Sequence, residues 1–227
     1  MKSSLKKWLK KHKILVIILA GCIMLPLILA ITLGCMLLTT QQSFPRPEIT
    51  PEDWMRQSRV VMKGMQQFSQ EDPTQVQKLR LAPEDVAALL KFLVNNDQIG
   101  ALFSGNGAPE GVPWIVTYDK HGWFHTAYLM ETGIGKFHCL LQFSYRLHYA
   151  DNTFTITPLD CRVGRLRISN DMVAKYVLPR VYEELEKSNY IQMFHPAVES
   201  ITTDHKNRIV IRYIPDNAKI FAMGLFR

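Results

Sequence analysis

The feature that most constrains this chain is an uncharged, mainly apolar stretch over residues 14–38, directly after a cluster of lysines. A helix of this length covers roughly 38 Å at about 1.5 Å per residue, which exceeds a bilayer hydrocarbon core of roughly 30 Å. Pro26 lies inside the stretch, but a membrane helix tolerates a proline when neighbouring groups satisfy the freed carbonyl. The sequence therefore predicts a transmembrane signal-anchor over residues 14–40.

The charges of the chain are unevenly distributed. Residues 1–40 hold six of the 27 basic residues and no acidic residue, so residues 41–227 keep 21 basic and 20 acidic residues. By the positive-inside rule, the basic tail over residues 1–13 stays in the cytoplasm and the rest of the chain is exported. We therefore expect a single-pass protein of the cytoplasmic (inner) membrane with an extracytoplasmic, periplasmic domain. The near-neutral domain argues against nucleic-acid binding, which needs basic residues on the folded part.

Two cysteines leave an alternative to an uncleaved anchor. Cys22 follows Ala20 and Gly21, and Cys35 follows Gly34, so each resembles a bacterial lipidation site. Sixteen further apolar residues follow Cys22, and a processed lipoprotein has no reason to keep them. We favour the uncleaved signal-anchor, and both interpretations place the domain outside the cytoplasm.

The remaining chain predicts a short linker over residues 41–49 and one α+β domain over residues 50–227. Amphipathic patterns predict helices over 50–70, 83–96 and 169–187, the last interrupted at Pro179. Strand patterns occupy 112–118, 122–130, 137–149, 154–161, 163–168, 198–203 and 208–214. The predicted fold is a curved antiparallel sheet packed on, or wrapped around, amphipathic helices.

The longest predicted strand has one continuous apolar face. A curved sheet around a helix would leave such a face open as a groove for a lipid chain, whereas an ordinary core would fill it with helix side chains. The candidate groove residues are Phe137, Cys139, Leu141, Phe143, Tyr145, Leu147 and Tyr149 of this strand, with Met62 and Met65 of the first helix. Burying one methylene is worth about 0.8 kcal/mol, so an acyl chain needs no polar motif for binding.

No residue pattern predicts catalysis, a metal site or a cofactor. His121 and His125 are four residues apart, but they lie in a predicted hairpin and no glutamate lies between them, unlike the ligands of a helical zinc site. The glycine-rich loop around Ser104 has no P-loop lysine. We expect a non-enzyme without cofactors. A hydrolase with a dispersed site, tested at His125, Ser104 and Asp160, is the remaining alternative, and we expect no activity from it.

Cys139 and Cys161 are the only cysteines outside the apolar segment. An exported location permits a disulfide between them. If Tyr149 opposes Thr153 across the hairpin, the two thiols lie one diagonal step apart on the same face, and a bulge near Pro158 would close the gap. The alternative is a pair of reduced thiols that fill core space.

Two segments carry a resemblance to a known family. Residues 79–90, LRLAPEDVAALL, and residues 163–168, VGRLRI, with the closing hairpin over 198–213, resemble the YpmS-like family of membrane-anchored extracytoplasmic proteins. The resemblance covers about residues 75–214 and implies a fold similar to tubular lipid-binding domains. It implies no catalytic residue.

These observations lead to one functional expectation. The chain is expected to be an anchored envelope protein whose exported domain binds a lipid or another long apolar ligand, in lipid handling or transport. The alternative is a non-enzymatic scaffold or accessory subunit that uses the same surfaces to meet an envelope protein partner. In both cases the membrane bilayer is a partner and nucleic acid is not.

Overall fold

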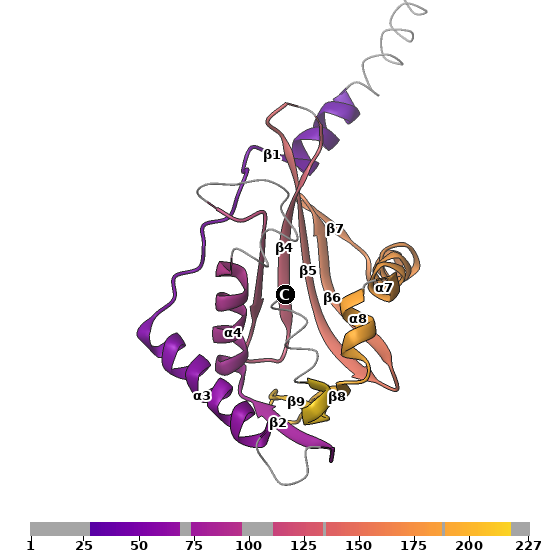
Figure 1. The fold of residues 1–227 in the computed structure, drawn as a ribbon. Coiled ribbons are helices and arrows are strands. Elements are labelled where there is room, and N and C mark those ends of the chain that lie inside the picture. The colour runs from indigo at the N-terminus through magenta and orange to yellow at the C-terminus, as the bar shows by residue number, and fades with distance from the viewer. Residues whose placement is uncertain (1–27, 69–73, 97–110, 134, 188, 219–227) are drawn as a thin grey trace, which may run out of the picture.

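The computed structural model describes residues 28–68, 74–96, 111–133, 135–187 and 189–218. Over these ranges the chain is an α+β protein with a curved antiparallel sheet that does not close into a barrel (Figure 1). This confirms the α+β class and the curved antiparallel sheet of the prediction. Among the described residues, no helix is both long and apolar enough to cross a membrane. The first half of the predicted anchor, residues 14–27 with Cys22, lies outside the described residues.

Along the chain, two helices separated by one strand follow the short first strand. A run of strands, a helical segment and a final hairpin come next. The elements are β1 (Leu38–Thr39), α3 (Pro51–Phe68), β2 (Gln77–Leu81), α4 (Pro83–Asn95), β3 (Trp114–Tyr118), β4 (Phe124–Glu131), β5 (His138–Ala150), β6 (Thr153–Val163), β7 (Leu166–Ile168), α6 (Asn170–Met172), η1 (Val173–Val177), α7 (Leu178–Lys187), α8 (Asn189–Phe194), β8 (Val198–Thr203) and β9 (Ile209–Tyr213). The helix 28–37 precedes β1.

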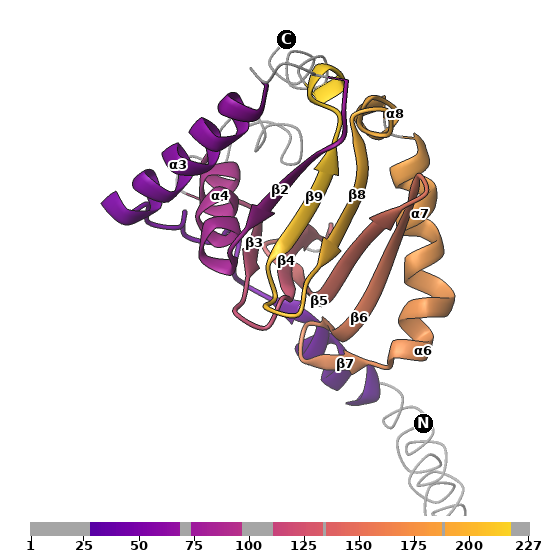
Figure 2. The same ribbon diagram turned by 90° about the horizontal axis from the view of Figure 1, so that it is seen from below.

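Strand β5 is the centre of the sheet because its length lets it pair with several partners. On one edge it pairs first with β4 and then, at Tyr149 and Ala150, with β8. On the other edge it pairs with β1 and β6. Between β4 and β8, no strand of the described residues pairs with this edge of β5, so β3–β4 and β8–β9–β2 diverge from it and the sheet curves (Figure 2).

Helices cover the two flanks of this sheet. Helix α4 packs on β3 and carries α3 on its outer side, whereas α6, η1 and α7 pack along β6 on the opposite flank (Figure 2). The segment η1 is a π-helical turn, in which the amide of Leu178 donates to the carbonyl of Val173. Pro179 follows directly, so the predicted interruption of this helix is a widened turn rather than a break.

The segment between the helix 28–37 and α3 is attached to the domain. Leu38 and Thr39 pair with Cys139 and His138 of β5. Phe44 forms an isolated antiparallel bridge with Val112. The sequence predicted the end of the membrane segment and a short polar linker here, without strand pairing, because pairing between residues 68 to 101 positions apart leaves no local pattern.

Glycine at position 164 permits the close approach of the helix 28–37 to the sheet. Gly164 has φ +59°, and an added methyl group would collide with the backbone of Met36 and Leu37. The adjacent amide of Arg165 donates to the carbonyl of Met36 at 2.8 Å. The β6–β7 turn therefore holds the end of this helix against the domain.

Candidate functional site: an apolar face, a cavity and a polar hollow

Strand β5 forms over His138–Ala150, as its alternating pattern predicted, but its apolar face is only partly open. Phe143, Tyr145 and Leu147 pack against the core formed by β6, η1 and α7. Burial raises the pKa of the Tyr145 phenol. At the far end Tyr149 is completely buried beneath β8, β9 and α8. The helices fill this half of the predicted groove with an ordinary core.

The half of the same face next to the helix 28–37 is different. Here Tyr128 is 37%, Met130 44% and Phe137 43% exposed, although Cys139 behind them is buried. Tyr128 and Met130 pair with Leu141 and Cys139, so these side chains share one face of β4 and β5. We call Tyr128, Met130 and Phe137 the proximal apolar surface. The end of β4 and the start of β5, which carry it, lie beside the point where the helix 28–37 joins β1 (Figure 1).

The predicted groove members on α3 do not join the β5 residues. Helix α3 packs on α4 and near β2, and Met62 is 63% exposed on its outer side. The side chain of Met65 lies outside the described residues. Met62 instead belongs to an exposed apolar stripe on α3, which we call the α3 stripe. It consists of Trp54, Met55, Val61 and Met62.

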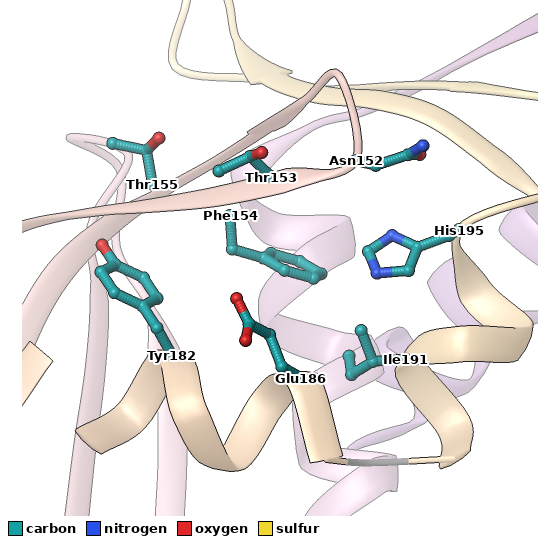
Figure 3. A pocket seen from close by; sticks show the side chains of 8 residues that line it. All are labelled: Asn152, Thr153, Phe154, Thr155, Tyr182, Glu186, Ile191 and His195. Atoms are coloured by element: carbon teal, nitrogen blue, oxygen red, sulfur yellow. The ribbon is translucent and has the colours of Figure 1, made fainter. Parts of the chain in front are cut away.

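A cavity of 390 Å³ opens at the opposite end of β5, between the β5–β6 turn and helices α7 and α8 (Figure 3). Phe154, Tyr182 and Ile191 form its apolar walls, and Glu186 and His195 contribute polar groups. Its volume lies within the usual range of small-molecule sites. The sequence pattern did not reveal this cavity, because the residues that line it come from a turn and from two helices about 30 to 40 positions further along the chain.

Buried groups hold the inner wall of this distal cavity. The Tyr149 hydroxyl lies 2.7 Å from His195 Nδ1 and donates to Asn152 Oδ1 at 3.2 Å. Phe154 packs against the Tyr149 ring with centroids 4.6 Å apart. Burial raises the pKa of the Tyr149 phenol. The hydroxyl is therefore neutral at physiological pH and positions the His195 ring at the cavity.

The opposite face of the sheet carries a polar hollow of 270 Å³ across β3, β4, β5 and β6. Two residues of the dispersed-hydrolase alternative meet here, since His125 and Asp160 both line it. Ser104 lies outside the described residues. Instead, Ser144 places its Oγ 2.8 Å from His125 Nδ1, while His125 Nε2 lies 3.1 Å from Asp119 Oδ2.

Hydrogen bonds hold the Asp119 carboxylate in place. Its Oδ1 accepts backbone N–H bonds from His121 and Trp123, each at 2.9 Å. Burial alone would raise the pKa of Asp119, but the bonds from the Trp123 amide and from His125 outweigh it, so the pKa is lowered. Asp119 is thus ionised at neutral pH. Sequence reasoning missed this chain of contacts because it depends on the register that pairs His125 with Ser144.

Of the two alternatives for Cys139 and Cys161, the structure has the pair of buried reduced thiols and not the disulfide. The hairpin pairs Tyr149 with Phe154, one residue away from the predicted register, and a bulge lies after Ser144. Cys161 then opposes Phe143, four residues or about 13 Å along the strand from Cys139. This exceeds the reach of a disulfide, so the bulge separates the two thiols instead of joining them.

In the described part of the chain, no group of three or more His, Cys, Asp or Glu residues could hold a metal ion. Comparison of the chain with protein-family models, with curated proteins and with solved structures finds no match.

Proposed function

We propose that the chain is a single-pass membrane protein whose extracytoplasmic domain binds a lipid or another long apolar ligand at the proximal apolar surface. The observation that carries the proposal is the exposure of Tyr128 and Met130 on one face of β4, with exposed Phe137 directly before β5, next to the apolar helix 28–37. A lipid chain leaving the bilayer beside the anchor would meet this surface first.

The attachment of the anchor supports this arrangement. Strand β1 pairs with the start of β5, and the Arg165 amide bonds the carbonyl of Met36. The apolar segment is therefore joined to the sheet without a free tether, and the proximal apolar surface faces the same end of the domain. Exposed Lys136 adjoins Phe137 and would favour an anionic headgroup.

The expected affinity is modest. Complete burial of a Phe or Met side chain stabilises by about 1.5–3 kcal/mol. Because less than half of each of the three side chains is exposed, each contributes about 1 kcal/mol on binding. Such a site is weak for a free ligand, so the proposal depends on the high local lipid concentration that the anchor provides.

The test places the full chain in nanodiscs of phosphatidylethanolamine and phosphatidylglycerol that contain a photoactivatable fatty acid. After irradiation, peptide mass spectrometry locates the adducts. We expect adducts on the tryptic peptides 121–136 and 137–146, which carry the proximal apolar surface. Adducts confined to the anchor peptide 14–56 would refute the proposal.

A matched pair of variants sharpens this test. Met130→Ser combined with Phe137→Ser should lower the adduct yield on the two sheet peptides about fivefold or more, because the apolar contact is lost. Met62→Ser removes a methionine from α3 that is more exposed than Met130, 63% against 44%, and should leave that yield unchanged. An equal loss in both variants would place the ligand elsewhere.

The α3 stripe favours a second candidate function, that of an accessory subunit that docks a partner protein. Trp54, Met55, Val61 and Met62 are each 44–63% exposed and recur on one side of the helix. An exposed apolar stripe on a surface helix is typical of a protein–protein interface. Helix α3 lies on the flank of the domain away from the helix 28–37 (Figure 1), which favours a protein over the bilayer.

Site-specific photocrosslinking in native membranes tests this second function. A benzophenone side chain at Met62 should yield one discrete adduct of constant size. Lys63 is also exposed but lies on the opposite side of the helix from Trp54, and the same probe there should give no such adduct. Equal labelling from both positions would argue against a docking stripe.

A further inference from the structure

The polar hollow contains a serine, a histidine and an aspartate joined by two hydrogen bonds. Ser144 lies on β5 and His125 directly opposite it on β4. Asp119 lies in the β3–β4 turn, where the amide of Asp119 donates to the carbonyl of Trp123 at 3.0 Å. The distances of 2.8 and 3.1 Å match those between a nucleophile, a base and the group that orients the base.

The contacts also select the tautomer of His125 that nucleophilic catalysis requires. Ionised Asp119 can only accept a hydrogen bond, so Nε2 of His125 carries the proton. Nδ1 then holds the lone pair and accepts a hydrogen bond from the Ser144 hydroxyl. The roles of the two ring nitrogens are exchanged relative to the serine proteases, but the order of donors and acceptors is the same.

The surroundings of the triad restrict both its flexibility and its substrate. The Arg146 guanidinium covers the Trp123 ring at 4.4 Å and donates to the carbonyl of His121 at 2.9 Å, which fixes the turn that carries Asp119. Gln142 and Arg162 line the hollow. The Nε of Arg162 donates to Asp160 Oδ2 at 2.8 Å, so the donors that face a substrate are the terminal NH groups of Arg162 and the Gln142 amide. The hollow is small, and the His125 side chain is 39% exposed, so only a short, water-accessible substrate fits.

We propose that Ser144, His125 and Asp119 form a nucleophilic site that hydrolyses short-chain carboxylic esters. Ser144 Oγ attacks the ester carbonyl carbon while its proton moves to His125 Nδ1. Gln142 or Arg162 bonds the carbonyl oxygen as it becomes negative. The ester C–O bond then breaks, His125 returns the proton to the leaving alkoxide, and an alcohol departs from the acyl-serine.

Water completes the cycle. His125 Nδ1 removes a proton from a water molecule that attacks the acyl carbon, and the carboxylic acid leaves as Ser144 regains its proton. Asp119 does not touch the substrate and acts as a positioning residue. The hollow lies on the face of the sheet opposite the proximal apolar surface, so this activity does not rest on lipid binding.

The experiment uses the full chain in mild detergent. A fluorophosphonate probe should add to the tryptic peptide 137–146, and p-nitrophenyl acetate should be hydrolysed above the background rate. Ser144→Ala should abolish the adduct and lower the rate at least 100-fold, and His125→Gln should do the same. His148→Gln alters an exposed histidine further along β5 and should leave both readouts unchanged.

Two further measurements separate catalysis from a structural role. Arg162→Gln should lower the rate about tenfold if the guanidinium stabilises the oxyanion, with circular dichroism unchanged. Ser144→Cys should create a thiol whose rapid alkylation depends on His125. Absence of the fluorophosphonate adduct from a folded chain, or an ester hydrolysis rate that survives Ser144→Ala, would overturn the proposal.

Discussion

Replacement of Asp53 by asparagine tests how α3 is held in the position that displays its apolar stripe. Asp53 is buried at the start of α3, where Oδ2 accepts bonds from the Lys91 ammonium at 2.8 Å and from the Thr50 amide at 2.9 Å. The bond from Lys91 is the largest cause, followed by the Thr50 amide, of a pKa lowered from 3.8 to about 2. Lys91 belongs to α4, so this carboxylate links the two helices.

The pKa shift of Asp53 sets an upper limit on what this carboxylate contributes to the free energy of unfolding. A depression from 3.8 to about 2 corresponds to about 2.4 kcal/mol at most. The Lys91 side chain is 35% exposed, so solvent screening lowers the expected cost of Asp53→Asn at pH 7 to about 1–2 kcal/mol. Because folding lowers the pKa, the stabilisation is complete above pH 4 and is lost as the pH falls toward 2. About half should remain at pH 3.

Urea unfolding of the full chain in detergent, followed by tryptophan fluorescence, measures this cost. Trp54 contacts Phe92 of α4 edge to face at 4.7 Å and so reports on the same interface. Glu52→Gln in the same helical turn is the control, because Glu52 is exposed and should change the unfolding free energy by less than about 0.5 kcal/mol. A cost of Asp53→Asn that is equal at pH 7 and pH 3 would refute the reasoning.

Three other variants or treatments test the packing around the sites. Gly164→Ala should lower the free energy of unfolding in urea by about 3 kcal/mol or more, because a methyl group there meets backbone atoms. Gly133→Ala is the control: Gly133 has φ +71° but lies in open space, so the loss should be only about 1 kcal/mol. Equal losses would contradict the close contact at Gly164. Iodoacetamide should alkylate Cys139 and Cys161 only after unfolding, because burial raises the pKa of both thiols, and rapid labelling of the folded chain would be inconsistent with their burial. Tyr149→Phe should lower the unfolding free energy by about 1–2 kcal/mol through its lost hydrogen bonds, and an unchanged value would show that these bonds contribute nothing net.

The local elements of the fold were largely predictable from sequence. The alternation of apolar residues over 137–149 predicted β5, and turn residues between apolar runs predicted the hairpins that became β3–β4 and β8–β9. Both signals are local, since side chains on one strand face recur every second residue. The same pattern did not indicate which part of the apolar face is buried. The elements that bury Leu147 and Tyr149 are α7 and β8, which lie more than 30 positions further along the chain.

The candidate sites were much less predictable. A single bulge after Ser144 moves Cys161 opposite Phe143 and separates the two thiols. The pairing of Ser144 with His125 likewise depends on the register of β4 against β5, and composition carries no information about it. Polar residues on an exposed sheet face look ordinary in sequence, so only their juxtaposition identifies a candidate site.

The sequence by itself determined where most helices and strands form, with β1, β2 and α8 as the exceptions, that the sheet is antiparallel, and that the domain after the lysine-rich apolar segment is nearly neutral. These properties follow from residue type and short-range periodicity. Tertiary structure decided that residues 38–44 join the sheet, that Tyr128, Met130 and Phe137 stay exposed, and that a serine, a histidine and an aspartate meet. Each of these depends on contacts between distant segments, whose register and packing are set by the whole fold.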